Sequence, residues 1–188
     1  AKYLVTGGAG FLGSNVVDAL LAAGDKVVVF DDFSSGSKKN VFDWSPKDAK
    51  VVEGDVRDAK SIAKAAKGCD YVLHFAAVAG VARSVDDPES TFAVNVGGTI
   101  NTLLAAREAK VKRVIVASSA AVYGESPVLP KEETMLAMPY SPYGASMLMG
   151  EDAARVFYTT YRLETVCLRL FNLYGPRQDL ASPHSGMG

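Results

Sequence analysis

Residues 3–13, YLVTGGAGFLG, decide the fold that we expect for this chain. The first four residues are largely apolar and favour a strand, and the glycine-rich part follows without a spacer. A helical pattern then runs through Asn15–Leu21. Strand, glycine turn and helix in this order form the context in which a glycine fingerprint binds a dinucleotide.

The glycines of this stretch fit two fingerprints. Gly8, Gly10 and Gly13 match G-x-G-x-x-G, whereas Gly7, Gly10 and Gly13 match G-x-x-G-x-x-G. In both cases a residue without Cβ permits a tight turn and a close approach of the backbone to a pyrophosphate. The helix N-terminus adds free N–H groups and the positive end of a dipole. The predicted phosphate site consists of Gly7, Gly10, Phe11, Leu12 and Gly13.

Apolar runs that favour strands alternate with helical patterns along the rest of the chain. Uninterrupted runs such as Val27–Phe30 and Val114–Ala117 indicate strands that are buried on both faces, as in a parallel sheet. The pattern predicts an α/β fold with a doubly wound parallel (Rossmann) sheet of six strands. The expected strands are Tyr3–Thr6, Lys26–Phe30, Lys50–Glu53, Asp70–Phe75, Arg113–Ala117 and Thr165–Leu170. The expected helices are Phe11–Ala22, Ala59–Lys67, Pro88–Ala109 and Pro142–Tyr161.

The bulk composition fits one soluble domain. Of the 188 residues, 48% are apolar and 22% are charged, which is enough for a core and ordinary for a soluble surface. A net charge of −1 and scattered basic residues exclude a general attraction to nucleic acid or anionic membranes. No apolar stretch is long enough for a membrane span, and a strand occupies the place of a signal peptide. We therefore expect a cytoplasmic protein in which Cys69 and Cys167 are free thiols and no metal site exists.

Carboxylates follow the second and third predicted strands. Asp31 and Asp32 lie at the distance from Gly13 at which an acidic side chain binds the adenosine ribose hydroxyls and repels a 2′-phosphate. This favours NAD over NADP, although Lys38 and Lys39 are residue types that receive a 2′-phosphate. A loop cap is the alternative role for Asp31.

After the third strand, we expect Asp55 to accept from the adenine amino group and Val56 to donate its N–H. Asp58 fits a helix cap instead.

The fourth predicted strand ends in small residues. Ala76 and Ala77 allow a pyrophosphate and a nicotinamide ribose to pass close to the backbone. His74 lies within the apolar run, so we interpret it as a core histidine. Asn95 stands on an otherwise apolar helical pattern beside Gly97 and Gly98. We place it beside the cofactor, hydrogen-bonded to the backbone of the neighbouring loop.

The remaining motifs complete a family pattern. After the fifth strand come residues 118–124, SSAAVYG, then a loop rich in Pro and Glu, then residues 141–144, SPYG, and finally residues 169–177, RLFNLYGPR. Together with the motifs above, the sequence resembles the extended short-chain dehydrogenases/reductases. Within them it is most similar to NAD-dependent sugar-nucleotide epimerases/dehydratases of the UDP-glucose 4-epimerase type. The matching stretches span nearly the whole chain in order and spacing.

The resemblance implies roles for two residues of the fifth strand and the following helix. Tyr143 is implied to be the catalytic tyrosine, and Ser119 the serine that shares a hydrogen bond with the sugar hydroxyl. Oxidation of an alcohol needs a base at the hydroxyl, and tyrosine with a pKa of about 10 must be made more acidic for that role. Family members do this with a lysine four residues later, which also holds the nicotinamide ribose.

The chain departs from the family at that lysine position, where it has Met147. Methionine carries no charge, so one of two cationic influences on Tyr143 is absent. Ordinary apolar packing is the alternative explanation for this residue. We hypothesise that the chain binds NAD but turns over slowly, or not at all, through the family mechanism.

The resemblance also concerns the substrate and the assembly. It implies that Asn172 contacts a substrate phosphate, and Arg83 is a candidate for a sugar carboxylate. We expect an NAD-binding domain at 1–175, and the start of a missing or truncated substrate-binding region at 176–188, because family members continue into a smaller C-terminal domain.

Ala120 and Ala121 stand where dehydratases and decarboxylases carry acidic residues. The favoured function is a UDP-sugar 4-epimerase; a reductase or dehydratase of the same family and a non-catalytic NAD-binding module remain alternatives. Many relatives are homodimers through the two long helices, so a homodimer is expected.

Overall fold

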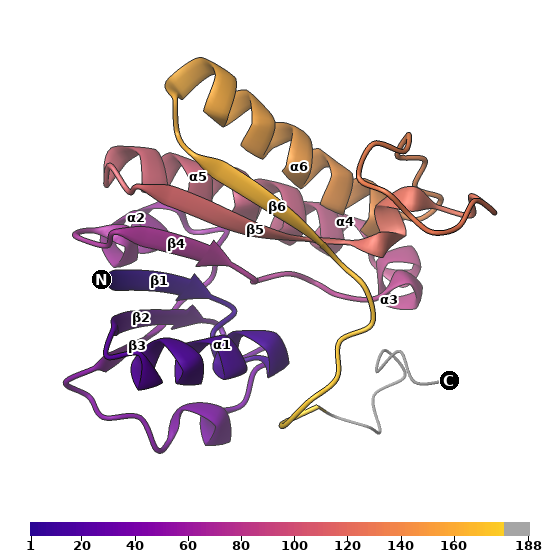
Figure 1. Cartoon of the computed structure of the whole chain (residues 1–188). Coiled ribbons are helices and arrows are strands. Elements are labelled where there is room, and N and C mark those ends of the chain that lie inside the picture. The colour runs from indigo at the N-terminus through magenta and orange to yellow at the C-terminus, as the bar shows by residue number, and fades with distance from the viewer. Residues whose placement is uncertain (179–188) are drawn as a thin grey trace.

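The structure, a computed structural model, describes residues 1–178 and shows a parallel six-stranded sheet packed between helices (Figure 1). The strand order is β3-β2-β1-β4-β5-β6, so the winding direction changes between β1 and β4. The strands are β1 (Lys2–Thr6), β2 (Lys26–Asp31), β3 (Ala49–Glu53), β4 (Tyr71–His74), β5 (Arg113–Ser119) and β6 (Thr165–Leu170). This confirms the predicted doubly wound α/β fold.

The helices connect these strands in the predicted order. The α-helices are α1 (Phe11–Ala22), α2 (Ala59–Ala66), α3 (Val81–Asp86), α4 (Pro88–Phe92), α5 (Gly98–Glu108) and α6 (Pro142–Tyr161). Shorter helical segments are η1 (Lys38–Val41), η2 (Ala93–Gly97) and η3 (Ala120–Tyr123). As predicted, Asp58 caps α2 by accepting from the backbone N–H groups of Lys60 and Ser61.

Three parts of the expected element pattern differ from the structure. The single helix expected over Pro88–Ala109 is divided into α4, the π-helical segment η2 and α5. The short helix α3 and the turns η1 and η3 were not predicted. A π-helical turn accommodates an extra residue in the helix, and such turns are frequent at functional sites.

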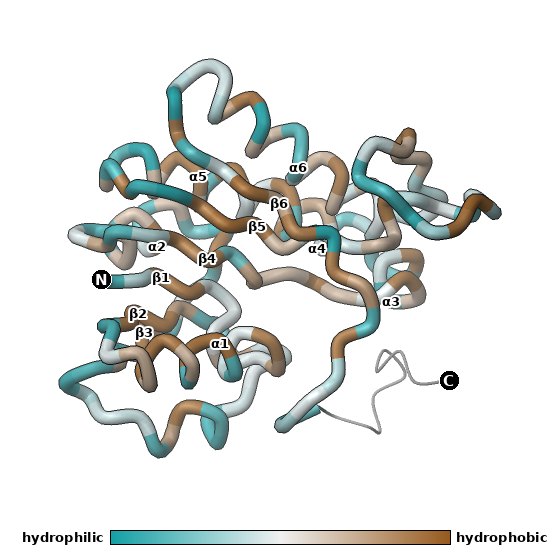
Figure 2. Tube along the Cα trace, in the orientation of Figure 1, coloured by the Kyte–Doolittle hydropathy of each residue, from teal (hydrophilic) through white to brown (hydrophobic). Residues whose placement is uncertain are grey.

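The two faces of the sheet have separate cores. Leu4, Phe30 and Val114 belong to the larger core, which also holds Ile62 of α2, Leu103 of α5 and residues of α6. On the opposite face, α1 and Trp44 cover the smaller core around Val5 and Val29. Hydrophobic residues accordingly concentrate along the central strands in Figure 2. Both cysteines are free thiols, as predicted, and Cys69 is buried.

One part of the sheet has no helix over it in the described chain. Val166 and Leu168 of β6 alternate on the face opposite α6 and are 38% and 40% exposed. Residues 171–178 leave β6 and run back across the sheet toward α1 (Figure 1). There the Asn15 side chain donates to the carbonyl of Pro176 over 2.9 Å, and Arg177 pairs with Asp18 over 2.5 Å.

The expected boundary at residue 175 remains a prediction. Residues 176–178 lie against α1, and most of the expected region 176–188 lies outside the described residues. Within residues 1–178, no helix is both long and apolar enough to span a membrane.

Candidate cofactor and active site

A cleft of about 840 Å³ opens at the carboxyl edge of the sheet, where the strand order reverses. Ligands of open α/β sheets bind at this position, because the loops that leave neighbouring strands there diverge to opposite faces. Segments following all six strands contribute to its wall. The cleft brings together nearly all the predicted site residues: Gly7, Gly10, Phe11, Leu12, Gly13, Asp31, Asp32, Asp55, Val56, Ala76, Ala77, Arg83, Ser119, Tyr143 and Asn172.

The glycine turn is built for close approach. Gly7 has a φ of +65°, and a Cβ on it would lie 2.7 Å from the backbone nitrogen of Ala76. A Cβ on Gly13 would lie 2.1 Å from the carbonyl oxygen of Gly7. Gly8 is buried against Val29 and does not line the cleft, so the cleft-lining triplet is the one of the G-x-x-G-x-x-G pattern.

The N-terminus of α1 faces the cleft without a side-chain cap. Gly10 occupies the N-cap position, and among the described residues no side chain caps the N–H groups of the first turn. The N–H groups of that turn are therefore available to an anion, and the helix dipole favours one there. These features fit the pyrophosphate of a dinucleotide.

The two carboxylates after β2 have different environments. Asp31 is buried and accepts from the backbone N–H of Ala9 over 2.9 Å and from that of Phe33 over 2.8 Å. Burial raises the pKa of Asp31, and the two backbone hydrogen bonds oppose that shift. Asp32 is exposed and accepts from the backbone and hydroxyl of Ser34. Asp31 thus holds the glycine turn as well as lining the cleft, and the remaining lone pairs of its oxygens can accept from ribose hydroxyls.

The third carboxylate, Asp55, is paired within the protein. Its oxygens accept from the guanidinium of Arg57 over 2.5–3.1 Å, which lowers the pKa of Asp55. Val56 beside it is buried, and the helical residue Gly98 packs so closely that a Cβ there would lie 2.5 Å from the Val56 side chain. The predicted adenine contact of Asp55 therefore has an internal competitor in Arg57.

The middle wall of the cleft is fixed from behind. The Thr6 hydroxyl accepts from the backbone N–H groups of Phe75 and Ala76 and hydrogen-bonds the Nδ1 of His74 over 2.7 Å. His74 is buried, and its Nε2 hydrogen-bonds Thr99 over 2.9 Å. Burial lowers the pKa of His74 to about 4. The interpretation of His74 as a core histidine is confirmed.

Asn95 lies behind this wall rather than on it. In η2 its Oδ1 accepts from the backbone N–H of Val78 over 2.7 Å, and its Nδ2 donates to the Val78 carbonyl and to Ser146. The expected bond to the neighbouring loop is confirmed. Asn95 does not line the cleft itself. Its side chain holds Val78, which does line the cleft, and a role of Asn95 toward the cofactor stays a prediction.

Ser119 and Tyr143 meet at the far end of the cleft. Their side chains are hydrogen-bonded, although Ser119 comes from the end of β5 and Tyr143 from the first turn of α6. The start of α6 is set locally, because Ser141 caps it by accepting from the Gly144 N–H and Pro142 occupies its first turn. Burial raises the pKa of Tyr143, and the Ser119 hydrogen bond lowers it less. The phenol is therefore neutral near pH 7.

Met147 does not line the cleft. Its side chain is 7% exposed and packs with Val122 and Tyr123 in a small apolar cluster that reaches Tyr143. The apolar packing expected as the simple explanation for Met147 is present. Among residues 1–178, the cleft wall has one cationic side chain, Arg83, which is exposed and extends from α3.

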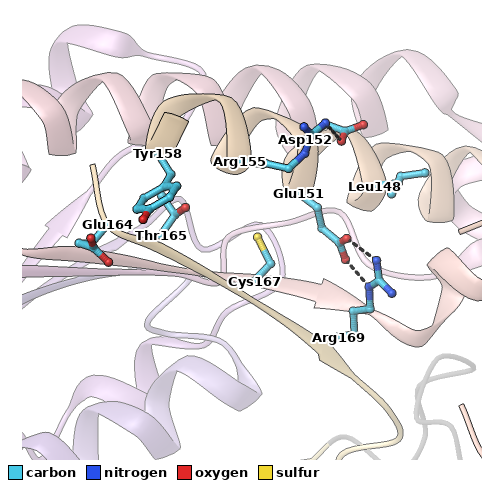
Figure 3. A pocket seen from close by; sticks show the side chains of 9 residues that line it. All are labelled: Leu148, Glu151, Asp152, Arg155, Tyr158, Glu164, Thr165, Cys167 and Arg169. Atoms are coloured by element: carbon cyan, nitrogen blue, oxygen red, sulfur yellow. Dashed lines mark hydrogen bonds and ion pairs between the residues drawn. The ribbon is translucent and has the colours of Figure 1, made fainter. Parts of the chain in front are cut away.

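A second hollow of about 490 Å³ lies between α6 and β6 (Figure 3). Within it Glu151 and Arg169 form a two-bonded ion pair at 2.9 and 2.8 Å, with side chains only 12% and 17% exposed. Ser118 donates to the same Glu151 carboxylate, and the Arg169 guanidinium lies over the Tyr123 ring. This pair joins β5, which carries Ser119, α6, which carries Tyr143, and β6, which leads into the segment with Asn172.

Some cleft residues were missed by the sequence interpretation. Residues 78–82 line the cleft. Behind them, the fully buried Ser84 accepts from the Tyr143 N–H over 3.0 Å and thereby docks α3 on α6. Leu170, Phe171 and Leu173 also line it. The sequence motif around Asn172 included these last residues, whereas nothing local marks Ser84 as a contact of a residue 59 positions away.

Comparisons with known proteins agree with this geometry. The sequence profile described as the NAD dependent epimerase/dehydratase family matches residues 3–187. A UDP-glucose 4-epimerase from Mycolicibacterium smegmatis is 42% identical over 190 residues, which cover 100% of this chain and 60% of that protein. A UDP-glucose 4-epimerase from Streptomyces lividans is 40% identical over 97% of this chain and 55% of that protein.

Solved structures show the same likeness. The NAD complex of the Thermus thermophilus UDP-glucose 4-epimerase has a TM-score of 0.90 and 40% identity over 98% of this chain and 60% of its own. A UDP-N-acetylglucosamine 4-epimerase from Methanobrevibacter ruminantium has a TM-score of 0.92 and 39% identity over 97% and 58% of the two chains. A dTDP-glucose 4,6-dehydratase from Streptomyces venezuelae, with NAD bound, has a TM-score of 0.89 and 37% identity over 94% and 57%. The chain thus spans less than two thirds of the length of these relatives.

Proposed function

Because the chain belongs to the NAD-dependent epimerase/dehydratase family, we propose that it is the cofactor-binding part of a UDP-sugar 4-epimerase of the UDP-glucose/UDP-galactose type. The observation that carries the proposal is the single cleft that joins an uncapped glycine turn to hydrogen-bonded Ser119 and Tyr143. The NAD-dependent family and the NAD-bound structural relatives make NAD the cofactor of this cleft.

Each end of the cleft has a proposed task. Asp31 and Asp32 receive the adenosine ribose, and Gly7, Gly10, Phe11, Leu12 and Gly13 receive the pyrophosphate. Ala76 and Ala77 leave room beside the backbone for the nicotinamide ribose. When bound, NAD would supply the hydride chemistry that interconverts the two sugars. Tyr143 takes and returns the proton of the 4-hydroxyl, while Ser119 hydrogen-bonds that oxygen.

Met147 predicts weak catalysis by this chain. Tyr143 must lose its proton to act as a base. Burial raises its pKa, and there is no lysine at position 147 to oppose the shift. The positive charge of oxidised nicotinamide is then the remaining influence that favours the phenolate. A slow or inactive epimerase that still binds NAD follows from this environment.

The cleft wall favours epimerisation over the related reactions. Ala120 and Ala121 line it directly after Ser119 and have no proton to donate or accept. A dehydratase or decarboxylase needs an acidic group beside the reacting sugar carbon. We propose Asn172 and Arg83, both in the wall, as contacts for the anionic parts of the substrate.

A second candidate function is a non-catalytic NAD-binding module. Met147 favours it, because its side chain packs in the apolar cluster and supplies no charge to Tyr143. Two measurements separate the candidates. Calorimetry tests NAD binding, and incubation of the chain with NAD and UDP-glucose or UDP-galactose tests for the other sugar and for a trace of NADH absorbance.

The expected result is NAD binding with slow sugar interconversion that disappears in Tyr143→Phe. Binding with no interconversion and no NADH signal supports the module. No NAD binding at all contradicts both candidates.

We further propose a cytoplasmic homodimer built through α5 and α6. Met147 and Phe157 of α6 are buried, whereas Tyr158, Met149 and Val156 of the same helix are exposed. Light scattering coupled to gel filtration tests this proposal. A monomer over the working concentration range contradicts it.

A further inference from the structure

The loop after β2 packs directly on the glycine turn. A Cβ built on Gly36 would lie 2.8 Å from a carboxylate oxygen of Asp31 and 3.0 Å from the carbonyl carbon of Ala9. Ala9 lies between the cleft-lining Gly7 and Gly10, directly before Gly10, and it is completely buried. The loop is therefore in contact with the centre of the turn rather than with its ends.

Both polar groups of Ala9 are engaged by this loop and by the strand before it. The Ala9 N–H donates to Asp31 over 2.9 Å. The Ala9 carbonyl accepts from the backbone N–H of Ser37 over 3.0 Å and from the Asn40 side chain over 2.8 Å. Asp31 lines the cleft, whereas Ser37 and Asn40 do not. Ser37 bonds through its backbone, so Asn40 is the partner outside the cleft wall that holds Ala9 through its side chain.

We infer that Asn40, in the 3₁₀ turn η1, is a positioning residue for the phosphate-binding turn. By holding the Ala9 carbonyl on the outer side, it fixes the plane of the peptide between Ala9 and Gly10. Because Gly10 is the N-cap of α1, the orientation of this peptide sets the start of the helix. The N–H groups of the first turn of α1 are then directed to the cleft. The inference rests on the proposed placement of the NAD pyrophosphate at this turn.

Ligands with and without a pyrophosphate distinguish a role of Asn40 in positioning the phosphate-binding turn from a role in supporting the whole cleft. NAD and ADP-ribose carry a pyrophosphate, whereas adenosine reaches only the carboxylate end of the cleft around Asp31 and Asp55. Loss of the Asn40 hydrogen bond is expected to weaken NAD and ADP-ribose roughly 3- to 10-fold, because one hydrogen bond to a carbonyl that keeps a second donor is removed. Adenosine binding is expected to change by less than about twofold.

The test compares three variants by calorimetry or competition, well below their melting temperatures. Asn40→Ala removes the donor, and Asn40→Asp keeps the shape but places a carboxylate oxygen against the Ala9 carbonyl, so its loss of NAD affinity is expected to be larger. Phe42→Ala is the matched control, since Phe42 ends the same turn, is 84% exposed and carries no charge. Circular dichroism establishes that each variant is folded.

Three outcomes decide the matter. A selective loss for NAD and ADP-ribose in both Asn40 variants, with Phe42→Ala unchanged, supports the inference. Equal losses for adenosine and NAD, or no loss at all while the unaltered chain binds NAD, overturn it and leave the proposed function intact. Failure of the unaltered chain to bind NAD overturns the proposed cofactor site and the inference together.

Discussion

At the scale of single residues, Tyr143 shows how an environment sets the chemistry of a side chain. Two neighbours influence the phenol group of Tyr143. Ser119 hydrogen-bonds it, and Met147 contributes only apolar packing. Burial disfavours the charged phenolate and raises its pKa. Met147, four positions along α6, supplies no charge that would oppose this shift.

Replacement of Met147 by lysine is expected to lower the pKa of Tyr143, because an ammonium group near the phenol favours the phenolate. The variant is also expected to be less stable and to melt at a lower temperature, since position 147 is packed among Val122 and Tyr123. Tyrosinate absorbance measured against pH, with Tyr143→Phe subtracted, gives the pKa, and sugar interconversion gives the rate.

Met149→Lys is the matched control for this substitution. Met149 lies on the same helix and is 50% exposed, so a lysine there stays in water and leaves the pKa of Tyr143 unchanged. An unchanged Tyr143 pKa and no gain in rate for Met147→Lys would show that position 147 is not the limiting defect.

At the scale of elements, the division of one helix into α4, η2 and α5 places Asn95 at the back of the cleft wall. The π-helical turn directs its carboxamide to both backbone groups of Val78 and to Ser146 of α6. Asn95 thereby links three elements without touching the cleft itself.

Truncation of Asn95 to alanine is expected to lower the free energy of unfolding by about 2–4 kcal/mol, because the N–H and carbonyl of Val78 lose a buried partner. Urea denaturation measures the change. Asn101→Ala is the comparison, since Asn101 of α5 donates to two carbonyls nearer the surface, and its loss is expected to cost about 1 kcal/mol. Equal losses in the two variants would contradict a special role for η2.

The ion pair between α6 and β6 allows a second test at this scale. Glu151→Gln is expected to cost roughly 3 kcal/mol of stability, because it leaves the largely buried Arg169 guanidinium without its counter-charge. Asp152→Asn on the same helix removes the exposed pair with Arg155 and is expected to cost less than about 1 kcal/mol. Similar denaturation midpoints for the two variants would show that the Glu151 pair is no stronger than a surface pair.

At the scale of the whole molecule, His74 couples stability to pH. In the unfolded chain its imidazole takes up a proton near pH 6.5, whereas in the folded chain burial lowers its pKa to about 4. The unfolded state therefore binds more protons between these values. Stability from this residue is full above pH 6.5 and falls by up to about 3 kcal/mol as the pH is lowered to 4.

Denaturation curves collected across that pH range test the coupling. His74→Asn removes the titrating group, so the variant is expected to lose less stability on acidification than the unaltered chain, although it starts from a lower value. Parallel pH profiles for the two proteins would contradict the assignment of the effect to His74.

Local patterns in the sequence predicted much of the architecture. The bounds of α1, α6 and β6 agree with the expected ranges because their signals are local: the glycine turn before Phe11, the Ser141-Pro142 start, and the largely apolar stretch TVCLRL. The predicted strand ends indicated that the carboxylates, the glycine turn and Ser119 lie at one edge of the sheet. In the structure these residues and Tyr143 line one cleft there. Parallel strands bring their carboxyl ends together, which is why an ordered set of motifs was enough.

Long-range contacts account for what was missed. The helix α3 is only six residues long, and Ser84 anchors it to a backbone N–H 59 residues later. Asn40 bonds to a carbonyl 31 residues earlier, and the bond of Asn95 to Ser146 spans 51 residues, whereas its bond to the neighbouring loop was predicted. A residue's type and spacing show what it can bond, whereas the fold determines which partner it meets.

The outer edge of β6 bears on how this chain behaves at high concentration. Among residues 1–178 no strand pairs with that edge, and Val166 and Leu168 expose aliphatic surface beside it. A strand with unpaired N–H and carbonyl groups and an apolar face is a template for pairing with another chain. Precipitation of the isolated chain would then begin at β6, and a charged side chain in place of Leu168 is the substitution that would keep it dispersed.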